Sequence, residues 1–235
     1  EAALRSGAGK VTIATHPAHA SMINLACPEL MVRGMRDRAG LDPLIAAVDV
    51  VVAGTGLGRT SWSEDMFHAC LGTGGPIVID ADGLNILAEQ FATLNPDDLP
   101  LGRWILTPHP AEAGRLLGCH AREIQADRVG AALKLAARYN AIVVLKGCGT
   151  VIAGPLGRYA ICPLGNPGMA SAGSGGVLAG VIGAMLAQGL DPWEAACTGV
   201  VAHASAGDLA AEQIGQRGLI ASDITAHLPA VLNPV

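Results

Sequence analysis

Aromatic residues are scarce in this sequence, and so are charged residues. Only 3% of the residues are Phe, Trp or Tyr and only 15% are charged, whereas 51% are hydrophobic. The core must therefore be built from Ala, Val, Leu and Ile, and the low charge predicts a buried sheet together with a contact between subunits. The length of 235 residues suits one sizeable domain, from residue 1 to residue 235.

Basic clusters and paired cysteine motifs are also absent. The formal net charge of −5 argues against a nucleic-acid partner. Small anions are not excluded, because the N-terminus of a helix attracts them whatever the net charge. The six cysteines are scattered and form no CxxC pair. This pattern predicts a reducing compartment rather than a disulfide framework or a zinc site.

Long hydrophobic runs are missing as well. The longest apolar stretch, residues 175–187, is rich in glycine and too short to span a bilayer. No signal peptide opens the chain, which predicts a cytoplasmic protein without a membrane partner. The sequence starts with EAALRSGAGK, without Met and inside a helix-like pattern, so we expect that a preceding segment is missing.

Short apolar runs alternate with helical patterns along the chain. The runs that predict buried strands are Val11–Thr15, Asp49–Ala53, Ile77–Asp80, Trp104–Thr107 and Ala141–Leu145. Residues 150–163 predict a hairpin that turns at Gly154–Gly157. This alternation predicts an α/β sandwich with a mostly parallel sheet.

Four helical segments stand out by their periodicity or their end signals. SWSE (61–64) is typical of a capping box, and Arg122–Tyr139 predicts one long amphipathic helix. Gly175–Gln188 and Pro192–Ala211 predict two further helices, the second with Asp191 as its N-cap.

Polar and glycine-rich stretches follow four of the predicted strands, where the ligands of parallel sheets usually bind. These stretches are GTGLG (54–58), DADGLN (80–85), TPHPAE (107–112) and KGCGT (146–150). GTGLG fits a simple turn as well as it fits a ligand contact, since Arg59 replaces the third glycine of a dinucleotide fingerprint. Asp80 and Asp82 suit either Mg²⁺, a substrate hydroxyl or a helix cap.

The remaining candidates point to phosphate binding. An isolated loop histidine is more often incidental, but His109 lies between two prolines on a stiff turn, which raises the case for a binding role; His16 and His19 lack an obvious partner. Lys146 followed by glycine suits a phosphate, although a lysine at the rim of the sheet is the alternative. In GNPGMASAGSGG (165–176), Asn166 offers an amide, and residues 173–176 offer successive N–H groups at a helix start.

Taken in order, these stretches resemble the ADP-dependent NAD(P)H-hydrate dehydratases of the ribokinase-like superfamily. The resemblance rests on GTGLG, DADGLN, TPHPAEAGRLLG, LKGCGTVIA, GNPGMASAGSGG and RGLIASDI, and it covers essentially the whole chain. It implies a ribokinase-like three-layer sandwich. It also implies hydrated NADH or NADPH as substrate, ADP as co-substrate with Mg²⁺, a homotetramer, and fusion to or pairing with an NAD(P)H-hydrate epimerase.

The resemblance also implies roles for individual residues. Gly56 and His109 would contact the hydrated dinucleotide, and Asp80, Asp82, Asn85 and Asn166 complete the candidate substrate site. The residues implied to contact the nucleotide are Lys146, Gly147, Cys148, Gly149, Thr150 and Gly175. No residue is assigned as a metal ligand.

Two departures from the family pattern matter. The glycine-rich loop of the family ends in G-x-G-D, and that Asp is expected to take the proton from the hydroxyl that is phosphorylated. Gly176 stands at this position here. Loss of a general base typically slows a reaction about 10²- to 10⁴-fold, unless Asp80 or Asp82 substitutes. The family also has a strand and a glycine-rich segment before the point where this sequence starts, with an alanine that touches the substrate.

Two other functions compete with this interpretation. A small-molecule kinase of the same fold would use the same Asp, but DADGLN together with TPHPAE favours the dehydratase. A non-catalytic nucleotide-binding module is favoured by Gly176 alone.

Overall fold

A six-stranded sheet forms the centre of the computed structural model, which describes residues 1–90, 99 and 101–233. The strand order is β3-β4-β5-β6-β7-β8; β3 to β6 are parallel, and β7 and β8 are antiparallel to their neighbours. The strands are β3 (Val51–Ala53), β4 (Ile77–Ile79), β5 (Trp104–Leu106), β6 (Ile142–Leu145), β7 (Thr150–Ala153) and β8 (Tyr159–Cys162).

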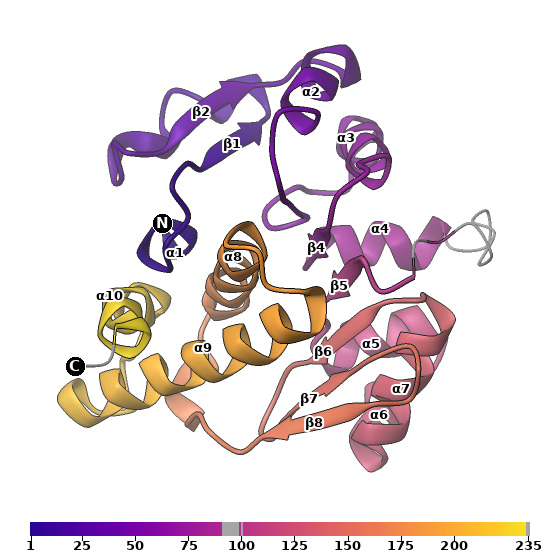
Figure 1. Cartoon of the computed structure of the whole chain (residues 1–235), viewed down its shortest axis with the longest axis vertical. Coiled ribbons are helices and arrows are strands. Elements are labelled where there is room, and N and C mark those ends of the chain that lie inside the picture. Colours follow the sequence, from indigo (N-terminus) through magenta and orange to yellow (C-terminus); the bar gives the residue numbers. More distant parts are fainter. Residues whose placement is uncertain (91–98, 100, 234–235) are drawn as a thin grey trace.

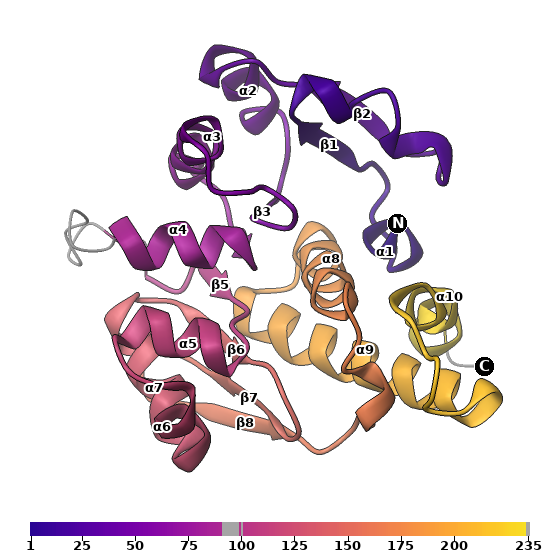
Figure 2. The same ribbon diagram turned by 180° about the vertical axis from the view of Figure 1, so that it is seen from behind.

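Helices cover both faces of this sheet (Figures 1 and 2). On one face lie α3 (Ser61–Leu71), α4 (Asp82–Gln90), α5 (Pro110–Leu117), α6 (Ala121–Ala126) and α7 (Arg128–Arg138). On the other lie α8 (Ser174–Ala187) and α9 (Pro192–Ile214), with α10 (Ala221–Leu232) packed on α9. The predicted α/β sandwich with a mostly parallel sheet is confirmed.

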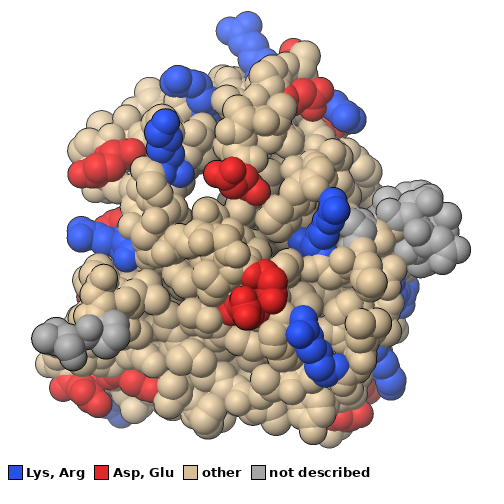
Figure 3. All heavy atoms as spheres, viewed as in Figure 1, with Lys and Arg blue, Asp and Glu red and all other residues tan. Residues whose placement is uncertain are grey.

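The N-terminal part carries a separate, two-stranded parallel sheet. Strands β1 (Thr12–Thr15) and β2 (Met31–Gly34) pair in register, and α1 (Ala2–Arg5) and α2 (Arg38–Ile45) flank them. Figure 1 places β1, β2 and α2 at the top of the molecule and α1 below them, near α10. Figure 3 shows an opening through the upper half of the same face.

The strands of the prediction are confirmed, each to within two residues at its ends. The hairpin of β7 and β8 is confirmed too, and it turns where Gly154 and Gly157 were expected to turn it. Strand β2 was not predicted, because its alternating exposure and its single arginine gave no clear apolar run.

The predicted long helix over Arg122–Tyr139 is wrong. It is two helices, because Asp127 leaves the helical conformation with φ −143° and ψ 78°. The Asp127 carboxylate then caps α7 by accepting a hydrogen bond of 2.8 Å from the Gly130 N–H. The capping box at α3 is displaced by one residue, since its N-cap is Thr60 and its partner is Ser63.

The core is aliphatic, as the composition predicted. Ile77, Ile79, Ile105 and Leu106 of the central strands are fully buried. Tyr139 is a polar aromatic residue in this core. It is fully buried and donates a hydrogen bond of 3.2 Å to the Leu116 carbonyl, and burial raises its pKa to about 12. Among the described residues, no helix is long and apolar enough to cross a membrane.

Candidate functional site

The predicted site residues gather at the carboxyl ends of β3, β4, β5 and β6. Two hydrogen bonds join these ends in pairs: the Lys146 N–H donates to the Pro108 carbonyl at 2.8 Å, and the Gly58 N–H donates to the Asp82 side chain, at Oδ2, at 2.8 Å. Parallel strands deliver their carboxyl ends to one edge of the sheet, which is where such folds bind ligands. The four stretches predicted from sequence therefore form one site.

An ion pair between Asp80 and Lys146 forms the centre of this site. Lys146 Nζ lies 2.6 Å from Asp80 Oδ1, and Thr107 Oγ1 donates to the same oxygen at 2.7 Å. The Asp80 side chain is 3% exposed and that of Lys146 is 18% exposed. A buried ion pair of this kind is costly to desolvate and contributes little net stability, so a functional reason for it is expected.

The backbone around Asp80 is held in an unusual conformation. Ala81, between the two aspartates, has a φ of 50°, which is unfavourable for a residue with a Cβ. Gly54 has a φ of 115°, and a Cβ there would overlap the Asp80 carbonyl oxygen. Strain of this type is concentrated at functional sites, and here it lies next to the Asp80 carboxylate, whose Oδ1 is held by Thr107 and Lys146.

His109 and Glu112 form a capping box at the start of α5. His109 Nδ1 accepts hydrogen bonds from the N–H groups of Ala111 and Glu112, so this nitrogen carries no proton and the ring is neutral. Burial lowers the pKa of His109, which favours the same state. His109 Nε2 lies 3.3 Å from Glu112 Oε1, and Glu112 Oε2 lies 3.8 Å from Lys146 Nζ.

The N-terminus of α8 faces the ion pair. Gly173, its N-cap, has a φ of 90°, and no acidic residue lies in the first turn. A Cβ placed on Gly175 would lie 3.0 Å from Lys146 Nζ and 3.8 Å from Asp80 Oδ2. Free N–H groups and the positive end of the helix dipole therefore lie next to a lysine, which is an arrangement suited to phosphate.

A buried serine–histidine pair supports this helix start from behind. Ser174 Oγ lies 3.3 Å from Nε2 of His203, which α9 contributes, and both side chains are buried. Burial lowers the pKa of His203 to about 4, and the charge of Lys146 adds to this shift. His203 is therefore neutral at neutral pH.

The free energy of unfolding is expected to fall as the pH falls from 6.5 towards 4. In this window the unfolded chain binds a proton at His203 and the folded chain does not, because the folded pKa is about 4 against 6.5. The loss is about 1.4 kcal/mol per pH unit at its steepest. Urea unfolding at several pH values measures it. His203→Gln should flatten the dependence above about pH 5, and an unchanged slope would contradict the assignment to His203.

The KGCGT loop between β6 and β7 is shaped by Arg128, the first residue of α7. Arg128 Nη2 donates to the carbonyl oxygens of Leu145 and Gly149 at 3.1 Å and 3.3 Å. Gly147 has a φ of 141° and leaves room for this guanidinium, since a Cβ there would lie 3.0 Å from Arg128 Nη1. With its carbonyls bound to Arg128, the loop can turn its N–H groups outward.

Two predicted substrate residues are instead committed to other protein groups. Asn166 Nδ2 donates to Asp208 Oδ1 at 2.9 Å and to the Gly207 carbonyl at 3.0 Å. Asn85 Oδ1 accepts from Arg115 Nε at 2.9 Å. Asn166 therefore anchors the glycine-rich loop to α9, and neither side chain takes part in the contacts around the Asp80–Lys146 pair.

Sequence reasoning missed four residues of the site: Thr107, Glu112, Arg128 and His203. Thr107 and Glu112 were within reach, because they flank His109 in the quoted TPHPAE stretch. Arg128 and His203 could not be found from sequence, because each belongs to a helix whose sequence pattern indicates only packing.

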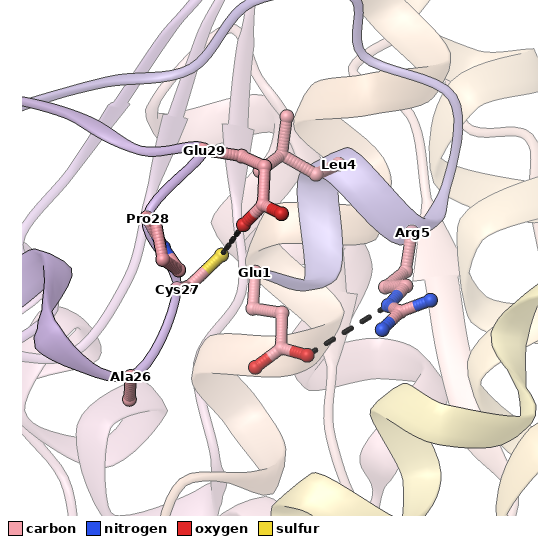
Figure 4. Close-up of a pocket in the computed structure, with 7 residues that line it drawn as sticks. All are labelled: Glu1, Leu4, Arg5, Ala26, Cys27, Pro28 and Glu29. Atoms are coloured by element: carbon pink, nitrogen blue, oxygen red, sulfur yellow. Dashed lines mark hydrogen bonds and ion pairs between the residues drawn. The ribbon is translucent and has the colours of Figure 1, made fainter.

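A separate cavity of about 440 Å³ lies near the N-terminus and contains none of the predicted site residues (Figure 4). Its walls come from α1 and residues 26–29. Figure 4 shows an Arg5–Glu1 ion pair of 3.7 Å and a 3.4 Å hydrogen bond from Cys27 Sγ to Glu29. The Arg5 and Glu1 side chains are about half exposed, so their pairing adds little stability.

Comparison with known proteins gives a consistent result. A family model described as NAD(P)H-hydrate dehydratase matches residues 1–230. The bifunctional NAD(P)H-hydrate repair enzyme Nnr of Coxiella burnetii is 46% identical over 234 residues, which cover 100% of this chain and 46% of that protein. The chain thus spans about half the length of the curated bifunctional relatives it matches.

Solved structures agree with the fold. The ADP/ATP-dependent NAD(P)H-hydrate dehydratase of Bacillus subtilis, co-crystallised with ATP and Mg²⁺, is similar with a TM-score of 0.82 and 29% identity. The similarity covers 98% of this chain and 83% of that one. A ribokinase-like superfamily protein of Enterococcus faecalis is similar with a TM-score of 0.87 and 26% identity, over 98% of this chain and 79% of that one.

Proposed function

Because this chain belongs to the NAD(P)H-hydrate dehydratase family, we propose that it dehydrates hydrated NADH or NADPH at the expense of ADP. The observation that carries the proposal is the Asp80–Lys146 ion pair, which lies at the carboxyl ends of the strands and against the N-terminus of α8. A lysine beside free helix N–H groups suits a phosphoryl group in transfer.

The nucleotide would bind between the KGCGT loop and the start of α8. Gly147 to Thr150 would supply N–H groups, Lys146 would supply its ammonium, and Gly175 would allow the close approach of the helix backbone. The hydrated ring would lie on the other side of Lys146, towards Gly56, Asp82 and His109. This division places the ring hydroxyl next to the terminal phosphate of ADP, as transfer requires.

Mg²⁺ fits this site as an ion that arrives with the nucleotide. Among the described residues there is no group of three or more His, Cys, Asp or Glu side chains that could hold a metal ion. Mg²⁺ commonly takes only one or two carboxylates and completes its shell with phosphates and water, and Asp82, whose Oδ2 accepts from the Gly58 N–H, would supply a carboxylate. When bound, the ion would neutralise charge on the phosphoryl group.

The proposal is tested by adding ADP and Mg²⁺ to hydrated NADH and following the return of the near-ultraviolet absorbance of NADH. Recovery that requires ADP and the enzyme supports the dehydratase. ADP binding without recovery of NADH would instead support a nucleotide-binding module. Consumption of nucleotide with a thiazole or sugar acceptor would support a kinase of the same fold.

We also expect the protein to form a homo-oligomer, with a tetramer as the family resemblance implies. The β7–β8 hairpin at the edge of the sheet exposes Leu156, Tyr159 and Ile161, at 85%, 53% and 52%. Figure 3 shows charged side chains scattered singly across one face, with wide uncharged areas between them. Light scattering at micromolar concentration should give a multiple of the 23.7 kDa chain mass, and a monomer mass would refute this expectation.

An NAD(P)H-hydrate epimerase is the protein partner we propose. Several relatives that match this chain over about half of their own length are described as bifunctional repair enzymes. An epimerase would supply the epimer that the dehydratase accepts, either as a fused domain or as a separate protein.

A further inference from the structure

Phosphoryl transfer to a hydroxyl requires a group that accepts the hydroxyl proton. The first turn of α8, where the phosphoryl group would lie, has no acidic residue. The described carboxylates at this edge of the sheet are those of Asp80, Asp82 and Glu112. Their hydrogen bonds decide which one is placed to accept a proton.

Asp82 and Glu112 are each held by a backbone N–H. Asp82 Oδ2 accepts from the Gly58 N–H at 2.8 Å, so it stabilises the GTGLG turn. Glu112 Oε2 accepts from the His109 N–H at 2.8 Å, and its other oxygen lies 3.3 Å from His109 Nε2. Both oxygens of Glu112 therefore face the start of its own helix.

Asp80 differs from Glu112 because its two donors share one oxygen, and it differs from Asp82 because its other oxygen faces the start of α8. Thr107 Oγ1 and Lys146 Nζ both contact Oδ1, at 2.7 Å and 2.6 Å. Oδ2 is turned towards the start of α8 and lies 3.8 Å from the position that a Cβ on Gly175 would take. The oxygen that faces the proposed phosphoryl site is thus the one that these two donors leave open.

We propose that Asp80 is the proton acceptor for phosphoryl transfer in this chain, a role that rests on the proposed function. The ring hydroxyl oxygen forms a bond to the β-phosphorus of ADP while the bond from that phosphorus to the bridging oxygen breaks. AMP leaves with the electron pair of the broken bond, and the hydroxyl proton passes to Asp80 Oδ2. The phosphate then leaves the ring carbon with the electron pair of the C–O bond, and the neighbouring ring carbon loses a proton to solvent as the double bond forms, which completes the dehydration.

Lys146 couples nucleotide binding to this role. In the structure its ammonium is bound to Asp80 Oδ1 and competes with any other partner of the carboxylate. A bound phosphate offers the same ammonium a second anion, and the geometry at Gly175 places that anion within reach. Lys146 would then be shared with the phosphate, and Asp80 would become a better proton acceptor when the nucleotide is present.

A double-mutant cycle between Asp80→Asn and Gly176→Asp tests the proposal. Asp80→Asn keeps the shape of the side chain but cannot hold the proton, so kcat should fall about 10²-fold or more. ADP binding, measured by calorimetry, should change much less than kcat. With Asp present at position 176, a second carboxylate is available, and Asp80→Asn should then lower kcat less than about tenfold.

A purely structural role for Asp80 predicts a different pattern. Asp80→Asn would then lower kcat by the same factor whether glycine or aspartate is at position 176. It would also raise KM for ADP. The pH profile adds a second readout, because the acidic limb of kcat should disappear in Asp80→Asn if Asp80 must be ionised. Asp49→Asn, at an exposed position before β3, is the matched control and should leave kcat unchanged.

Each remaining outcome also decides the matter. If the unaltered chain turns over and Asp80→Asn turns over equally fast, Asp80 does not act as the base, while the proposed function stands. If Gly176→Asp turns over and the unaltered chain does not, both the role of Asp80 and the activity proposed for the unaltered chain fail. If neither turns over, the proposed function itself fails. Should Asp80→Asn not fold, Asp80→Glu keeps the charge and displaces the carboxylate. Its kcat should then fall about tenfold with ADP binding retained, and an unchanged kcat would overturn the proposal.

Discussion

Replacing Gly176 with aspartate is expected to raise turnover by up to about 10²-fold, because a general base contributes about 10²- to 10⁴-fold and the paired Asp80 supplies only part of this factor. The structure accommodates the side chain. A Cβ on Gly176 would meet only Thr55 Cγ2, at 3.7 Å, which is an ordinary van der Waals contact. An aspartate in the first turn of α8 also interacts favourably with the helix dipole, so folding should be unaffected.

The new carboxylate would act without the neutralising contacts that restrain Asp80. No cation is among the heavy atoms within 4 Å of a Cβ at position 176, whereas Lys146 Nζ lies 2.6 Å from Asp80. A base with no cation bound to it accepts a proton more readily. ADP affinity should change little, apart from slight weakening by repulsion between the aspartate and the phosphates.

Steady-state kinetics with hydrated NADH and ADP measures the gain. Gly176→Asn is the matched control, since the amide has nearly the same shape but accepts no proton, and its turnover should stay near that of the unaltered chain. If Gly176→Asp folds, binds both substrates and turns over no faster, a base at this position is not what limits the reaction.

The sequence predicted the location of the site better than the role of each side chain. Short apolar runs show where strands end, and four such runs are followed by GTGLG, DADGLN, TPHPAE and KGCGT. The assembly of these four stretches at one edge of the sheet was therefore predictable. The Asp80–Lys146 contact joins residues 66 positions apart in the sequence. It could not be predicted as an ion pair, because side-chain direction depends on the strained turn at Ala81.

Hydrogen bonds within the protein explain why the predictions for Asn166 and for the helix over Arg122–Tyr139 differ from the structure. Asn166 was predicted to bind substrate, but Asp208, five residues after the buried His203 on α9, accepts a hydrogen bond from its side-chain amide. Asp127 looked like one more polar position of a long helix, but its carboxylate competes for the Gly130 N–H and divides that helix in two. The sequence alone does not show that Asn166 meets Asp208 or that Asp127 binds the Gly130 N–H.

Lys146→Met is expected to lower the free energy of unfolding by about 3 to 5 kcal/mol, the cost of leaving one member of a buried ion pair uncompensated. Methionine keeps the aliphatic stem, so packing changes little, but Asp80, with a side chain 3% exposed, loses its counter-charge. The same variant should weaken ADP binding by roughly 1.5 to 3 kcal/mol, the value of a charge-assisted hydrogen bond.

Urea unfolding of four proteins separates the two effects of Lys146. Adding Asp80→Asn to Lys146→Met removes the uncompensated charge, so most of the lost stability should return while ADP binding stays weak. Lys134→Met, at an exposed position on α7, makes the same chemical change and should alter stability by less than about 0.5 kcal/mol. If Lys146→Met is as stable as Lys134→Met, the pair contributes nothing to the fold. If the double variant regains ADP affinity as well, the lysine acts on ADP only through Asp80, and its direct contact with the phosphate would have to be abandoned.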